Sequence, residues 1–192
     1  MDPALIAWAR AVKRRHCLPP LWFFTDHTRA PAPLAVMARL PRRLSGVVLR
    51  LEGYPAPLAL AMAAARLCRA RGLALVAADA RLAARLGVGV HWRGGRRAGA
   101  RPRRGLASAS AHGVAQLVAA RRAGADLAFL SPVFSTHSHP GARTLGARGF
   151  AALARRAGPV KPFALGGISP RRLAVLGPRC AGLGGIDLFL KP

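Results

Sequence analysis

The sequence predicts an α/β fold, a compact TIM (βα)8 barrel with short or missing helices after the fourth and eighth strands. Two observations predict it. Eight short apolar runs recur along the chain, and stretches rich in alanine, leucine and arginine with a helical period separate most of them. Continuously apolar strands that alternate with amphipathic helices are typical of a parallel sheet covered by helices. Eight such strands favour closure into a barrel, and an open doubly wound sheet is the alternative.

Each predicted strand is a short run of apolar, β-branched or aromatic residues. In chain order the strands are expected at residues 21–26, 46–51, 73–79, 89–92, 105–110, 127–134, 161–167 and 181–187. Helices are expected near residues 32–42, 56–71, 80–87, 112–123, 147–157 and 170–177. The N-terminal segment 1–18 predicts one more amphipathic helix, over residues 3–15, which would cover one end of the barrel.

The chain of 192 residues is short for this fold, which typically needs about 250 residues. An arginine-glycine run, RGGRRAGARPRR (93–104), stands where the helix after the fourth strand would be, and no helix is expected after the eighth strand. These two omissions account for the shortfall. A single domain is therefore predicted over residues 1–192.

The composition excludes several classes of protein. Hydrophobic residues make up 52% of the chain, which argues against disorder, and no apolar run reaches the roughly 18 residues of a membrane span. The N-terminus places an acid before a basic cluster, the reverse of a secretory signal. Three widely spaced cysteines, Cys17, Cys68 and Cys180, indicate neither a zinc motif nor a disulfide framework. These features predict a cytoplasmic protein.

Positive charge is the unusual feature of the composition. The 31 basic residues exceed the 6 acidic ones by 25, and nearly all of the basic residues are arginine. Such a surface attracts polyanions, including nucleic acids and phosphorylated metabolites. The arginines are spread over nearly every predicted helix, however, as compositional bias of a genome would produce. Nucleic-acid binding is disfavoured further because the run at 93–104 lacks the interleaved aromatic residues that base stacking needs.

Chemistry in a parallel barrel collects at the carboxyl ends of the strands. The chain offers six acidic residues for carboxylate chemistry: Asp2, Asp26, Glu52, Asp79, Asp126 and Asp187. Asp26 ends the first predicted strand, where it could orient Arg50 or a ligand. Asp126 follows a helix and precedes a strand, so we interpret it as a turn residue, and His91 and His112 are expected to have structural roles.

Glycine pairs end the last two predicted strands. ALGGIS (164–169) ends the seventh strand at Gly166 and Gly167 and continues into a predicted helix with Ser169 at its N-cap. Glycine lets the backbone approach an anion closely, and a helix amino terminus offers free N–H groups and a positive dipole end. GLGGID (182–187) ends the eighth strand in the same way. Together the two ends predict a phosphate-binding cup, whereas one pair alone would indicate a tight turn.

Polar side chains follow the sixth predicted strand in the segment SPVFSTHSHPGARTLG (131–146). Five consecutive residues there can form hydrogen bonds: Ser135, Thr136, His137, Ser138 and His139. Hydroxyl and imidazole groups on a loop over a barrel mouth suit oxyanion binding and closure over a ligand. A polar surface loop without a ligand would have the same composition, so both interpretations stay open.

These motifs, taken in order, resemble the thiamine phosphate synthase/TenI family over residues 20–190. SPVFSTHSHPGARTLG is similar to the family's GPVFPTxTKPGxxxLG, ALGGIS to its AIGGI, and AGADLAFLSPVF to its AGADYxGxGPVF. FFTD, LRLEG, LVAADARLA, GVHW and SASAH resemble further family segments in the same order. The resemblance implies a TIM barrel whose synthase members join hydroxymethylpyrimidine pyrophosphate to hydroxyethylthiazole phosphate, with Mg²⁺, and release pyrophosphate.

The resemblance also implies roles for individual residues. Six would bind substrate phosphate groups: Thr136, Ser138, Gly166, Gly167, Ile186 and Asp187. Three would be catalytic and act on the leaving pyrophosphate: Arg50, Ser110 and His139. Asp79 matches one of two magnesium-binding aspartates. Asp187 replaces a serine of the family, and its carboxylate is unfavourable beside a phosphate unless the backbone amide makes the contact.

The chain departs from the family pattern around the pyrophosphate. Glu52 stands where the family has a lysine, and Ala78 stands where it has an asparagine. Arg96 falls at or near the position of the second magnesium aspartate, and His139 replaces a loop lysine. Magnesium bound to a diphosphate usually needs one or two carboxylates plus phosphate oxygens. Asp79 with Glu52 could provide them, or Arg96 and Arg97 could replace the ion electrostatically. The remaining alternative is that the diphosphate site is lost.

Three functions follow from these observations. The favoured one is a thiamine phosphate synthase-like transferase, and the second is a non-catalytic or repurposed barrel that binds a phosphorylated thiazole-type ligand. A nucleic-acid binder comes third. The family's tautomerase activity is a weaker alternative, because Ser131 and Pro132 stand where a histidine is expected and His137 or His139 would have to serve. Phosphorylated small molecules are the expected partners, and the sequence leaves a homodimer open.

Overall fold

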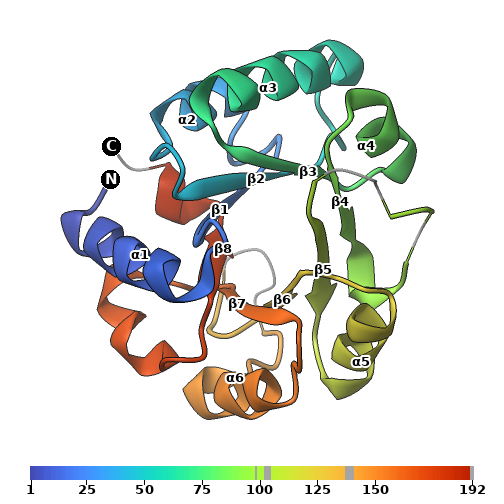
Figure 1. Ribbon diagram of the computed structural model, residues 1–192. Helices are drawn as coiled ribbons and strands as arrows, with labels where there is room; N and C mark the ends of the chain where they lie inside the picture. Colours follow the sequence, from blue (N-terminus) through green and yellow to red (C-terminus); the bar gives the residue numbers. More distant parts are fainter. Residues whose placement is uncertain (98, 102–104, 137–140, 191–192) are drawn as a thin grey trace.

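The computed structural model of the chain describes residues 1–97, 99–101, 105–136 and 141–190. Eight parallel strands form a closed barrel in chain order (Figure 1). Their bounds are β1 Leu21–Phe24, β2 Ser45–Leu49, β3 Ala74–Ala77, β4 Gly89–Trp92, β5 Ala107–Ala111, β6 Leu127–Leu130, β7 Lys161–Leu165 and β8 Gly182–Gly185. The ring closes where β8 pairs with both β7 and β1. The predicted barrel is therefore confirmed, and the open sheet is excluded.

Helices surround the ring of strands (Figure 1). In the described residues they are α1 Pro3–His16, α2 Pro33–Arg39, α3 Pro57–Arg71, α4 Ala80–Leu86, α5 Val114–Arg122 and α6 Gly146–Arg155. Proline, whose fixed φ suits the first turn, opens three of them, α1, α2 and α3. Gly72 and Gly87 end α3 and α4 in the left-handed conformation that a helix stop requires.

Some connections carry short 3₁₀ turns in place of α-helices. They are η1 Arg93–Gly95 after β4, η2 Pro170–Arg172 and η3 Ala174–Leu176 after β7, and η4 Asp187–Phe189 after β8. The described residues after β4 and β8 contain no α-helix, in agreement with the sequence analysis. The α-helix predicted at 170–177 was wrong, because Gly177, at φ 72°, and Pro178 stop it early and the Ser169 side chain forms no cap.

Aromatic side chains fill the interior of the barrel. The ring of Phe129 packs edge to face against Phe24 and Phe163, with centroids 4.8 and 5.5 Å apart. Gly184 makes room for them, because a Cβ atom at this position would lie 2.7 Å from the Phe24 ring. His91 is buried beside Phe24 and Phe129. The interior is thus a packed core, and a ligand must bind at the mouth.

No described helix is long and apolar enough to cross a membrane. Cys17, Cys68 and Cys180 are free thiols, of which the last two are buried. Burial raises the pKa of the Cys68 thiol to about 12, so this side chain behaves as a small apolar group.

Candidate functional site

The carboxyl ends of the strands bring several sequence-predicted site residues to one mouth. Arg50 directly follows β2, Asp79 lies two residues after β3, and Ser110 is in β5. Gly166 and Gly167 follow β7, whereas Ile186 and Asp187 follow β8. Thr136 is described and half-buried, but His137, Ser138 and His139 lie outside the described residues.

Two neighbouring strand ends bring together the glycine-rich tips at which the sequence analysis expects a phosphate cup. Leu165 of β7 is in register with Gly184 of β8, so the glycine-rich tips of these strands lie side by side. Among the described residues, no acceptor takes the backbone N–H of Gly166, Gly167, Ile186 or Asp187. These free donors are what an oxyanion requires. The helix dipole expected behind the cup is absent, because the segment after Ser169 is a 3₁₀ turn.

The polar loop after β6 packs against the cup. Phe134 donates its N–H to the carbonyl of Gly166 at 3.1 Å. Gly167 adopts φ +63°, and a Cβ atom there would lie only 2.3 Å from the carbonyl oxygen of Ser135. Arg172 joins both segments, since its Nη1 donates to the Gly167 carbonyl at 2.9 Å while its guanidinium lies 4.6 Å from the centroid of the Phe134 ring. The start of the polar loop is therefore fixed beside the free amides.

Arg50 is held in place from the end of β1. Its Nε donates to the Thr25 carbonyl at 2.8 Å, and its backbone N–H donates to Thr25 Oγ1 at 2.7 Å. Its Nη2 lies 3.3 Å from Asp26 Oδ2. Burial lowers the pKa of Arg50 below its ordinary value, an effect that Asp26 and Glu52 oppose. A guanidinium remains charged in such surroundings, so Arg50 is a fixed cation at the mouth.

Asp26 pairs with two arginines. One of them is Arg50, the residue that the sequence analysis suggested Asp26 could orient. Its Oδ2 atom lies 3.3 Å from Nη2 of Arg50 and also 3.3 Å from Nη2 of Arg29. Burial acts to raise the pKa of Asp26, but hydrogen bonds from Arg29 and the charges of Arg29 and Arg50 bring it below its ordinary value. The carboxylate is therefore ionised at neutral pH and holds both guanidinium groups.

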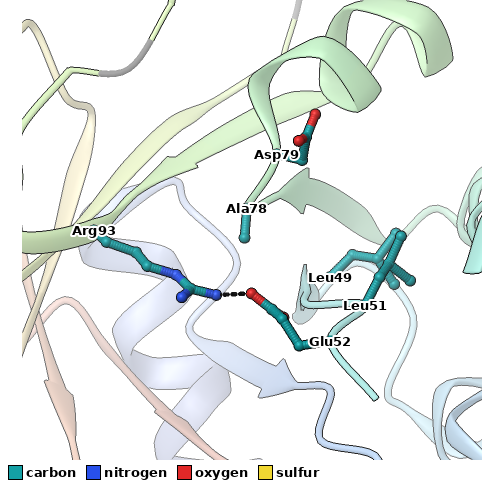
Figure 2. A pocket seen from close by; sticks show the side chains of 6 residues that line it. All are labelled: Leu49, Leu51, Glu52, Ala78, Asp79 and Arg93. Atoms are coloured by element: carbon teal, nitrogen blue, oxygen red, sulfur yellow. Dashed lines mark hydrogen bonds and ion pairs between the residues drawn. The ribbon is translucent and has the colours of Figure 1, made fainter. Parts of the chain in front are cut away.

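A pocket of about 330 Å³ opens between the ends of β2, β3 and β4, and it contains Glu52 and Ala78, two of the residues in which the chain departs from the family pattern (Figure 2). It is lined by Leu49, Leu51, Glu52, Ala78, Asp79 and Arg93. Arg93 forms an ion pair with Glu52 in front of Ala78, and the Asp79 carboxylate points away from this pair (Figure 2). Glu52, which follows β2, is thus paired with a cation that follows β4, across the end of β3.

The donors for a magnesium ion are few in this pocket. Asp79 is the N-cap of α4, and its Oδ1 accepts the N–H of Leu82 at 2.7 Å. In the described part of the chain, no group of three or more His, Cys, Asp or Glu side chains could hold a metal. The residues present fit Mg²⁺ through the second oxygen of Asp79, with phosphate oxygens completing the coordination.

Three further polar residues have contacts within the protein. Ser110 Oγ accepts the N–H of Gly94 at 3.0 Å and so ties η1 to β5. His91 Nδ1 lies 2.9 Å from Ser108 Oγ, and burial lowers the pKa of His91 to about 3, with smaller effects of Arg50 and Arg93. His112 Nδ1 lies 2.8 Å from the carbonyl oxygen of Ser131. These contacts are consistent with the structural roles expected for both histidines.

Several mouth residues were not identified from the sequence. Arg93 lines the pocket, whereas Arg96 and Arg97, which were considered as replacements for the metal, are exposed and do not line it. Arg29 and Arg172, which contact Asp26 and the cup, were also missed. With arginine present in nearly every element, only position relative to the strand ends could have distinguished them, and Arg93 directly follows β4.

Comparison with known proteins places the chain in a family. A family model described as "Thiamine monophosphate synthase" matches residues 25–186. A curated protein of Aquifex aeolicus (strain VF5), named "Putative thiamine-phosphate synthase 2", is 35% identical over 83 residues. That match spans 43% of this chain and 44% of the relative, less than half the length of each.

Solved structures share the barrel. Thiamine phosphate pyrophosphorylase from Pyrococcus furiosus matches with a TM-score of 0.71 and 18% identity, over 91% of this chain and 88% of that chain. A 2-keto-3-deoxy-6-phospho-gluconate aldolase from Zymomonas mobilis ATCC 29191 matches with a TM-score of 0.56 and 17% identity, over 94% and 85% of the two chains. At such identities the likeness shows the fold alone. The family model, however, spans most of the chain including the strand ends described above, so the chain belongs to the thiamine monophosphate synthase family.

Proposed function

We propose that the protein is a thiamine phosphate synthase-type transferase, which joins hydroxymethylpyrimidine pyrophosphate to hydroxyethylthiazole phosphate in thiamine biosynthesis. One observation carries this proposal: the same mouth holds free backbone amides at two adjacent strand ends and, at β2, an arginine fixed by Thr25 and Asp26. The amides suit the phosphate of the thiazole. The guanidinium of Arg50 suits the pyrophosphate of the other substrate.

In the proposed reaction, the bond between the pyrimidine methylene carbon and the pyrophosphate oxygen breaks, and its electron pair leaves with pyrophosphate. The lone pair of the thiazole nitrogen then forms the new carbon–nitrogen bond. Arg50 would stabilise the negative charge that develops on the leaving group, with a contribution from the hydroxyl of Ser110. His139, which lies outside the described residues, is proposed from the resemblance alone to act on the same leaving group.

Asp79 would hold Mg²⁺ through its second carboxylate oxygen when the diphosphate is bound. Held by Asp79, Mg²⁺ would supply positive charge beside the leaving group. Arg93 lines the same pocket and already forms an ion pair there. When a diphosphate enters, Arg93 would exchange the carboxylate of Glu52 for phosphate oxygens and so supply part of the positive charge that magnesium would otherwise bring to the leaving group.

Direct assay of the purified protein tests this proposal. Both phosphorylated substrates are supplied with and without Mg²⁺, and thiamine phosphate and pyrophosphate are measured. We expect both products in equal amounts, with Arg50→Ala reducing kcat by about 10²-fold or more. Arg39→Ala, at the exposed end of α2, is the matched arginine control and should leave kcat unchanged. Absence of product under both conditions would reject the transferase.

The second candidate is a barrel that binds a phosphorylated thiazole-type ligand without turnover. The Glu52–Arg93 ion pair favours it, because this pair occupies the pocket in which the diphosphate would bind. This candidate predicts calorimetric binding of hydroxyethylthiazole phosphate, no binding of the pyrimidine pyrophosphate and no product. Binding of both substrates would count against it.

A further inference from the structure

A line of four charged side chains crosses the mouth from β8 to β2. Asp187 follows β8, Asp26 and Arg29 follow β1, and Arg50 follows β2. Nη1 of Arg29 lies 3.6 Å from Oδ1 of Asp187. Asp26 completes the line, since one of its oxygen atoms pairs with both Arg29 and Arg50. Arg29 thus stands between the glycine cup and the leaving-group site.

Arg29 contacts Asp26 more closely than it contacts Asp187. Asp26 Oδ1 accepts the backbone N–H of Arg29 at 3.1 Å, and Asp26 Oδ2 accepts a hydrogen bond from its Nη2 at 3.3 Å. At 3.6 Å, the contact of Nη1 with Asp187 Oδ1 is too long for a hydrogen bond and is an ion pair alone. The Asp187 side chain is 55% exposed, compared with 25% for Arg29. Arg29 is therefore anchored on Asp26 and only loosely paired with Asp187.

We propose that Arg29 binds the ligand phosphate at the glycine cup and that Asp187 occupies Arg29 until this phosphate arrives. The proposal rests on the proposed function, because it takes the amides of Gly166, Gly167 and Ile186 to bind a phosphate. A phosphate dianion beside the Asp187 carboxylate would be repelled. Arg29 removes this conflict, since its Nη1 passes to phosphate oxygens while the exposed carboxylate turns toward solvent.

Asp26 is the positioning residue in this arrangement. Because its Oδ2 atom contacts Arg29 and Arg50 together, it fixes the distance between the cation at the cup and the cation at the leaving group. Because Nη2 of Arg29 contacts Asp26 and its Nη1 faces Asp187, Nη1 would pass to the phosphate while Nη2 stays on Asp26.

The test is calorimetric titration of hydroxyethylthiazole phosphate into the wild-type protein and three variants. Arg29→Ala should weaken binding about tenfold, as loss of one charge-assisted hydrogen bond does. Asp187→Asn should tighten it about threefold, because the competing anion is removed. Arg39→Ala, the matched exposed arginine, should stay within about twofold of wild type. Unphosphorylated hydroxyethylthiazole should show no difference among the four proteins.

Each alternative result has a distinct meaning. Unchanged affinity in Arg29→Ala, or weaker binding in Asp187→Asn, would overturn this inference and leave the proposed function intact. No binding of the phosphorylated thiazole to wild type would overturn both. Should Arg29→Ala fail to fold, Arg29→Lys replaces it: a smaller loss than tenfold, with an unchanged melting temperature, supports direct phosphate contact, and an affinity equal to wild type in both Arg29→Lys and Asp187→Asn refutes it.

Discussion

Gly167 shows how one residue decides whether the cup can form. Its backbone is in the left-handed region at φ +63°, and the carbonyl oxygen of Ser135 occupies the place of a Cβ atom. Glycine is thus needed here for two separate reasons, conformation and space. Sequence inspection identified the glycine pair as a candidate anion site but gave no indication that the β6 loop would press against it.

The Gly167→Ala variant measures the cost of placing a Cβ atom in this confined space. Gly87 has the same φ of +63° with nothing within 4 Å of a Cβ atom, so Gly87→Ala reports the conformational cost alone. We expect Gly167→Ala to be less stable than Gly87→Ala by at least about 1 kcal/mol, because the loop must move. Urea unfolding of both variants checks this. Equal losses would mean that the loop yields freely and does not shape the cup.

His91 predicts a pH dependence of stability. Its pKa is about 3 in the folded protein, below the ordinary value of 6.5, so unfolding favours protonation. Stability from this residue is complete above pH 6.5 and is lost as the pH falls toward 3. At pH 5.5 the loss should be about 1.4 kcal/mol relative to pH 7.5.

The variant His91→Gln isolates this effect, since glutamine can still bond to Ser108 but does not titrate. Urea unfolding of both proteins at the two pH values gives the comparison, and other titrating groups, including His16, cancel in the difference. We expect His91→Gln to lose less stability than wild type on acidification. An identical loss in the two proteins would show that His91 is not the group responsible.

At the scale of elements, the N-cap residue of α4 combines a structural and a candidate chemical role. Asp79 caps the helix through one carboxylate oxygen, which leaves the other for a metal ion. Asp79→Asn keeps the cap and removes the charge, whereas Asp79→Ala removes both. We expect Asp79→Ala to cost about 1 kcal/mol of unfolding free energy and Asp79→Asn less than about half of that.

The same pair of variants tests the metal. If Asp79 holds Mg²⁺, Asp79→Asn should abolish the magnesium dependence of product formation at nearly wild-type stability. Should activity retain its magnesium dependence in Asp79→Asn, Asp79 is a helix cap and the ion binds elsewhere. The two measurements separate a folding defect from a chemical one.

Element boundaries also show what could be predicted from the sequence. Apolar runs located all eight strands, and the positions of strand ends brought Arg50, Asp79 and the glycine pairs to one mouth, as observed. The segment 170–177 was assigned wrongly because its helical composition is overridden by Gly177 and Pro178. Contacts of long side chains were beyond prediction: the Arg93–Glu52 pair spans strands far apart in sequence, and arginine is too common here for its type to indicate a partner.

The whole molecule carries a net charge of +25, because 31 basic residues face 6 acidic ones and most of the basic side chains have no acidic residue with which to pair. Like-charge repulsion destabilises a compact state and is screened by salt. We therefore expect the melting temperature to rise as NaCl is increased from about 0.05 to about 0.5 M, with sodium chloride compared against an equal osmolality of sucrose. A falling melting temperature would show that the ion pairs at the mouth outweigh the general repulsion.

Strand β8 both seals the ring, between β7 and β1, and ends in half of the cup. Ligand binding is consequently linked to the pairing of β8. Without that pairing, the amides at the tip of β8 would not lie beside those of β7, and a phosphate could not contact both. A bound phosphate would link the tips of β7 and β8 across the seam between these two strands. Hydrogen exchange at the β7–β8 seam should therefore slow when ligand is present, while the seams of β3 and β4 should be little affected.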